Sequence, residues 1–254
     1  MLAQFCLRLA VGLGAALLIL SPGQINPRFY RTHFLTIIGL ATGALLLLHG
    51  SMAFWLGLSL GLGLASAFLG SLAWSLHGAP GGRLLTGVTA IALGGALIAF
   101  EADPMNSRGT PFQGMGWILA SDFASAWLLG TATTAMLMGH SYLVAPAMSL
   151  TPLLRLLAAL LGAVFIRAGL AGWSLVFWTR EHSLVNLEDV TIYWLPLRWG
   201  MSFLGPLICG WMAWQSARIR STQSATGILY VVVVFCFLGD LTGQLLQSAT
   251  GLCL

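Results

Sequence analysis

The chain has 254 residues, of which 58% are hydrophobic and only 7% are charged, and its mean hydropathy is +0.89. Soluble domains carry about 25% charged residues, so this composition excludes a water-soluble enzyme, a disordered regulator and a nucleic-acid-binding module. Every one of the 11 basic residues is an arginine, and no basic run is present to follow a phosphate backbone. The sequence therefore predicts an integral membrane protein.

A helix needs about 20 apolar residues to cross a bilayer. Eight segments meet this requirement, at about 4–20, 33–49, 52–76, 84–101, 115–139, 153–178, 196–215 and 225–249. The first segment lacks a small-x-small cleavage site, which favours a retained helix over a signal peptide. We therefore expect an all-α fold, a single polytopic transmembrane domain over residues 1–254 with about eight spanning helices and short loops.

The arginines indicate how this bundle is oriented. With eight spans, both termini lie on the same side of the membrane, with Arg8 and Arg198 near that surface. Six arginines fall on the other side: Arg28, Arg31, Arg83, Arg155, Arg218 and Arg220. Cytoplasmic loops carry an excess of basic residues, so both termini are predicted to be periplasmic. The absence of lysine is typical of a high-GC bacterial genome, which points to a bacterial cytoplasmic membrane.

Three ionisable residues lie inside the predicted spans: Asp122, Arg167 and Asp240. Counted along their helices at about 1.5 Å per residue, they lie within roughly 6 Å of one another in depth. Charges in the membrane interior are costly and mark ion, proton or substrate sites by default. Two carboxylates for one guanidinium leave a spare acid suited to proton exchange. The alternative is a buried ion pair that only fixes helix register.

Polar neighbours extend this group. Gln244 lies four residues after Asp240 and therefore on the same helix face. We predict that Asp122, Arg167, Asp240 and Gln244 form a proton-transfer site or a quinone pocket. Threonines at 131, 133 and 134 would continue a hydrogen-bonded chain, although threonines also bond back to their own helix.

Three histidines fall near the arginine-rich side, and two of them on facing helices would suit a haem b or a chlorophyll. The pairs considered are His33 with His140 and His77 with His140. No histidine lies deep in a span, and ordinary hydrogen bonding accounts for interfacial histidines equally well. The scattered cysteines form no metal-binding spacing.

The same side carries a second group of polar residues: His140, Tyr142, Arg218 and Arg220. Its functional interpretation is a site for a quinone head group, a lipid phosphate or a partner subunit, since the last span begins here and helix N-termini favour anions. The alternative is positive-inside anchoring with an ordinary helix cap.

The eight-span architecture resembles the membrane anchors of respiratory oxidoreductases of the polysulfide-reductase type. This resemblance implies a bundle that binds quinone and associates with an iron–sulfur subunit. It rests on architecture alone, and no site residue follows from it.

We therefore predict an integral membrane subunit of a larger redox or energy-converting complex, in contact with lipids and other subunits. It would provide a quinone-binding or proton-conducting bundle and would not be catalytic alone, because its loops are short and no catalytic motif is present. The alternatives are a proton-coupled transporter of small solutes, favoured by the intramembrane charges, and a structural, pigment-binding or haem-binding subunit.

Overall fold

The computed structural model describes residues 1–48, 52–76, 81–103, 114–145, 148–181 and 195–250, and this part of the chain is helical, without strands. Six of its helices are long and apolar enough to cross a membrane. They are α1 (Leu2–Ile19), α2 (Pro27–Leu47), α3 (Phe54–Ala73), α4 (Gly82–Ala102), α6 (Thr151–Glu181) and α9 (Thr222–Thr250). The chain is therefore a multi-pass helical membrane protein, as predicted.

Two further helices bring the number of long helices in the described residues to eight, where eight spans were predicted. One is α5 (Met115–Val144). The other is described from residue 195, passes through the π-helical segment η3 (Gly200–Leu204) and continues as α8 (Gly205–Arg218). A π-helical turn inside a helix is uncommon and is found most often at functional sites.

The helices differ from the predicted spans mainly at their ends. The second begins at Pro27 rather than at residue 33, because proline suits the first helical turn and Asn26 caps it by accepting a hydrogen bond from the Arg28 backbone N–H (3.0 Å). The preceding break contains the short 3-10 helix η1 (Pro22–Gln24). Residues 49–51, where the second predicted span meets the third, lie outside the described residues.

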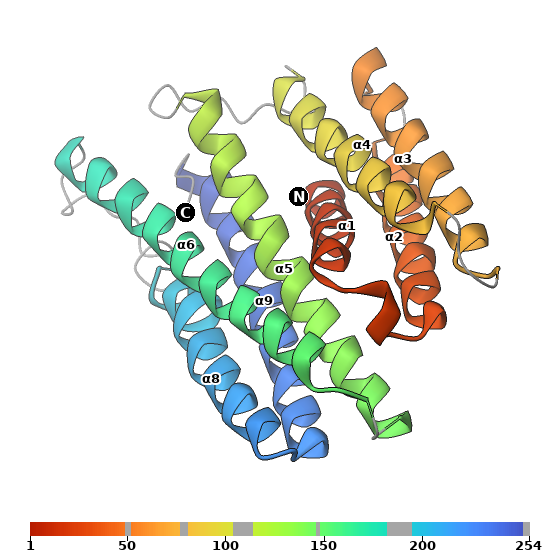
Figure 1. Ribbon diagram of the computed structural model, residues 1–254. Coiled ribbons are helices and arrows are strands. Elements are labelled where there is room, and N and C mark those ends of the chain that lie inside the picture. The colour runs from red at the N-terminus through yellow and green to blue at the C-terminus, as the bar shows by residue number, and fades with distance from the viewer. Residues whose placement is uncertain (49–51, 77–80, 104–113, 146–147, 182–194, 251–254) are drawn as a thin grey trace.

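The helices form two neighbouring groups (Figure 1). In one group, α1 packs against α2 and α4, and α3 packs against α2 and α4. In the other, α5 packs against α6 and α9, and α8 packs against α6 and α9. The joint between the groups is the contact of α1 with α5, and α1 is the most buried of the six apolar spans.

Two glycines allow α1 and α5 to approach at backbone distance. A Cβ atom added to Gly12 would lie 1.8 Å from the carbonyl oxygen of Ala126, and one added to Gly130 would lie 2.0 Å from the carbonyl carbon of Gly12. Small residues permit such contacts where lipid provides no hydrophobic drive between helices. This close approach brings the polar side chains of α1 within reach of those of α5.

Candidate functional site: a buried network around Arg8

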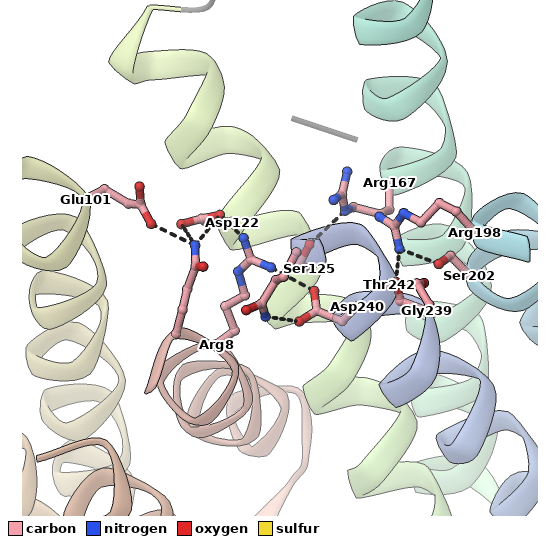
Figure 2. A network of polar contacts seen from close by, with 12 residues as sticks. Arg8, Glu101, Asp122, Ser125, Arg167, Arg198, Ser202, Gly239, Asp240 and Thr242 are labelled. Carbon is pink, nitrogen blue, oxygen red and sulfur yellow. Dashed lines mark hydrogen bonds and ion pairs between the residues drawn. The ribbon is translucent and has the colours of Figure 1, made fainter. Parts of the chain in front are cut away.

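Arg8 of α1 is the centre of a polar network buried inside the bundle (Figure 2). Its guanidinium forms ion pairs with two carboxylates from different helices, Asp122 of α5 and Asp240 of α9. The Arg8 Nη1 to Asp240 Oδ1 distance is 2.9 Å, and Nη2 contacts Asp122 Oδ1. The three side chains are at most 5% exposed. One cation therefore compensates two buried anions and ties three helices together.

On one side of Arg8, a glutamine links Asp122 to a third acid. Gln4 lies one turn before Arg8 on the same face of α1. Its Nε2 donates to Glu101 Oε1 of α4 at 2.7 Å and to Asp122 Oδ2 at 3.3 Å. Glu101 and Asp122 are both almost completely buried. Two acids thus share one amide group.

On the other side, Asp240 has a glutamine partner of its own. Gln244 lies one turn further along α9, and its Nε2 donates to Asp240 Oδ2 at 2.7 Å. The side-chain oxygens of Gln4 and Gln244 are both buried, and neither has a hydrogen-bond partner among the described residues. Each end of the network therefore consists of a carboxyl group next to an amide with a spare acceptor.

Two more buried arginines border the network beyond Asp240. Arg167 of α6 donates from Nε to the Ser125 hydroxyl at 2.7 Å. Arg198 donates from Nη1 to the Ser202 hydroxyl and to the Gly239 carbonyl. Both arginines line, with Asp240, a cavity of about 10 Å³, which is about enough for one water molecule.

The π-helical segment places Ser202 against α9. A Cβ atom on Gly239 would lie 2.8 Å from the Ser202 Cα, and one on Gly243 would lie 2.7 Å from Arg198 Cζ. Gly239 and Gly243 form a glycine-x-x-x-glycine pair of the kind that accommodates close helix contacts in membranes. These two glycines make the room that Arg198 and Ser202 occupy.

The structure brings the predicted residues Asp122, Asp240 and Gln244 into one hydrogen-bonded network. It places Arg167 beside this network, where Arg167 donates to Ser125 and lines a small cavity with Asp240. Four residues in or beside the network were not predicted from the sequence: Gln4, Arg8, Glu101 and Arg198. Arg8 and Arg198 were assigned to positions near a membrane surface, and both are 2% exposed. The spacing of Gln4 and Arg8, one turn apart in an apolar helix, was the available signal.

The threonines of α5 do not continue this network as a chain. Thr131 and Thr133 donate to the carbonyls of Trp127 and Leu129, four residues back on the same helix (2.7 and 2.8 Å). Backbone bonding of this kind is the ordinary behaviour of threonine in a helix.

The rim residues predicted from the sequence separate from one another. His33 and His140 line one cavity at the opposite end of the bundle, where α2 begins and α5 ends. Tyr142 is buried, and its hydroxyl donates to the Ser149 carbonyl. Arg218 and Arg220 are exposed in the turn between α8 and α9 and do not line that cavity. His77 lies outside the described residues.

Within the described residues, no group of histidine, cysteine and acidic side chains is arranged to hold a metal ion. Comparisons of the chain with protein-family models, with curated proteins and with solved structures find no match. The arrangement of the buried charges is therefore the basis for a functional proposal.

Proposed function

We propose that this chain is the integral membrane subunit of a redox or energy-converting complex, and that the Arg8 network takes up and releases protons coupled to quinone chemistry. The observation that supports this proposal is the pair of carboxyl–glutamine contacts on either side of Arg8. One is formed by Glu101 and Gln4, and the other by Asp240 and Gln244.

These contacts suit proton exchange because an amide can serve either form of the acid. With the acid ionised, the glutamine NH₂ donates to it, as described above. With the acid protonated, rotation of the amide by about 180° presents its oxygen as an acceptor, since the two ends of the amide are nearly equal in shape. The spare oxygens of Gln4 and Gln244 are the acceptors that the protonated state requires.

The size of the adjoining cavity favours one of the two roles predicted for this group, proton transfer over quinone binding. About 10 Å³ accommodates a water molecule and is far below the 300–1,000 Å³ typical of small-molecule sites (order of magnitude). We therefore assign proton transfer to the network and propose that the quinone binds elsewhere in the bundle.

Two experiments test the proposal. Native purification from the source membrane, followed by mass spectrometry, is expected to recover redox subunits with the chain. Replacing Asp240 with asparagine should then lower quinone-coupled turnover of that complex while leaving its assembly intact. A chain that purifies alone, or a D240N complex with unchanged turnover, would contradict the proposal.

A proton-coupled transporter is the second candidate, and the π-helical segment Gly200–Leu204 favours it. Transporters commonly place interrupted helices beside their substrate and ion sites, and this segment carries Ser202 next to Arg198. Purified protein in liposomes would then accumulate solute in response to an imposed pH gradient. Uptake that is independent of the gradient would exclude the coupling.

A further inference from the structure

The opposite end of the bundle contains a cavity of about 320 Å³ between the start of α2 and the end of α5. This volume is within the range of small-molecule sites. Apolar side chains such as Phe29, Leu137 and Met148 form much of its wall. Its polar lining comes from Asn26, Arg28, Thr32, His33, His140 and Ser141.

His33 contributes a buried nitrogen that has no hydrogen-bond partner among the described residues. Its Nδ1 lies 2.9 Å from the Phe29 carbonyl oxygen, and the side chain is completely buried. A carbonyl only accepts, so Nδ1 carries the proton and the neutral ring presents a lone pair at Nε2. That Nε2 atom is unpartnered. Burying an acceptor without a donor is unfavourable, and a ligand hydroxyl would relieve this.

The position of the cavity suits a ligand that enters from the bilayer. His33 lies six residues into α2 and His140 four residues before the end of α5, each within roughly 10 Å of a helix end. Val144, one of the lining residues, is 80% exposed. A ring at this depth can hold its polar edge among the histidines while an apolar tail remains in lipid.

The charge of the lining favours a neutral aromatic head group over a phosphate. Arg28 is the one arginine among the lining residues, and it is exposed. Phosphate sites use several charge-assisted donors. Phe29 and His33 both belong to the lining and pack against each other with ring centroids 4.3 Å apart, so the lining presents aromatic rings rather than further cations. A flat ring with hydroxyl groups at its edge matches these partners.

We propose that this cavity binds the head group of a membrane hydroquinone, and that a ring hydroxyl donates a hydrogen bond to His33 Nε2. The inference rests on the proposed function, because it assumes a quinone as the partner of this chain. It places the ligand about 18 residues along α5 from Asp122, or roughly 27 Å from the proton-handling network.

The test measures binding of 2-decyl-1,4-hydroquinone to the purified full chain in lipid nanodiscs, without oxygen. Its dimethyl ether, which has the same ring and tail but no hydroxyl donor, is the matched ligand. We expect the hydroquinone to bind about tenfold or more tightly than the ether, the effect of one buried hydrogen bond. Replacing His33 with phenylalanine, which keeps a ring but removes the nitrogen acceptor, should abolish this preference.

A second pair of variants keeps the test independent of the fold of His33→Phe. Ser141→Trp places a large ring in the cavity lining, whereas Leu143→Trp adds the same ring two residues further on α5, outside the lining and where the side chain is 45% exposed. Only the first should block binding of the hydroquinone. Any of four results would overturn the proposal: equal hydroquinone binding by the two tryptophan variants, no hydroquinone binding by the wild type, equal affinity of the wild type for the hydroquinone and its ether, or a haem absorption band in the purified protein.

The network variant Asp240→Asn separates this inference from the proposed function. This variant should bind the hydroquinone as the wild type does, because Asp240 does not line the cavity. Suppose that the wild type and Asp240→Asn both bind the hydroquinone, but that Asp240→Asn leaves quinone-coupled turnover unchanged. The cavity assignment then holds and the proton-handling assignment fails. If Asp240→Asn lowers turnover but Ser141→Trp still binds the hydroquinone normally, the proton-handling assignment holds and the cavity assignment fails.

Discussion

Arg8 compensates two carboxylates that come from different helices, so the stability of the bundle depends strongly on this side chain. Removing one partner of a buried ion pair is costly because a charge remains buried without compensation, whereas removing all partners together often costs little. The ion pairs of Arg8 with Asp122 and Asp240 can be tested by this difference.

We expect Arg8→Gln to lower the free energy of unfolding by about 3–5 kcal/mol. The triple variant Arg8→Gln, Asp122→Asn, Asp240→Asn should regain at least half of that loss, since all three side chains that form these ion pairs are then neutral. Reversible unfolding in detergent measures both variants. A triple variant no more stable than Arg8→Gln would show that packing of the Arg8 side chain, and not its charge, is what stabilises the bundle.

The proposed protonated state of Asp240 needs the amide oxygen of Gln244 as its hydrogen-bond acceptor. Gln244→Met keeps a side chain of similar length but removes that acceptor. In infrared difference spectra taken between high and low pH, the carboxyl C=O band of protonated Asp240 should weaken in this variant and be absent in Asp240→Asn. Gln215→Met is the control, since Gln215 is exposed on α8. A band that is unchanged in Asp240→Asn would exclude this acid.

At the scale of helices, the sequence was sufficient for the number of elements but not for their rotation about their axes. Long apolar runs predict spans because an unpaired backbone is intolerable in lipid. Counting along helices also placed Asp122 and Asp240 at one depth. The role of Arg8 depends instead on which face of α1 meets α5 and α9, and hydrophobic periodicity does not define this face in a helix that is apolar all round.

Gly12 sets the distance between α1 and α5, so a larger residue at this position should destabilise the bundle. In Gly12→Ala the new methyl would overlap the backbone of Ala126, so the helices must separate and Arg8 must withdraw from Asp122. We expect a loss of about 1–3 kcal/mol or more in unfolding free energy, the usual cost of overpacking. The thermal midpoint in detergent, compared with the wild type, measures it.

Gly39→Ala is the matched control for this change. Gly39 lies inside α2, and a Cβ atom there would meet nothing within 4 Å. Alanine in a helix interior is favoured over glycine by roughly 0.5–1 kcal/mol, so this variant should be as stable as the wild type or slightly more so. If the two variants behave alike, backbone contact does not fix the α1–α5 distance.

Among the residues whose side chains the structure describes, the arginines divide into a buried and an exposed set. Arg8, Arg167 and Arg198 are buried in or beside the network. The exposed arginines lie at the end of the bundle away from the network. This end contains η1, the starts of α2, α4 and α6, and the turn between α8 and α9. The arginines there are Arg28, Arg31, Arg83, Arg155, Arg218 and Arg220. Exposed arginines near a membrane surface are the ones that act as a positive-inside signal, and these six lie at one end of the bundle, so the prediction that this end is cytoplasmic rests on them.

The orientation can be tested with two serines at opposite ends of α9. Ser224 and Ser248 are both exposed, so single Ser→Cys variants, in a chain whose native cysteines are replaced, report on each side. With a membrane-impermeant maleimide applied to intact spheroplasts of a bacterial host, Ser248→Cys should be labelled at once. Ser224→Cys should react only after the membrane is permeabilised, because it lies with the exposed arginines on the cytoplasmic side.

The reverse labelling pattern would place the hydroquinone cavity at the periplasmic face and the proton-handling network nearer the cytoplasm. Protons released on oxidation of a hydroquinone in that cavity would then leave on the periplasmic side, so the labelling result also fixes the direction in which the proposed chemistry would move charge.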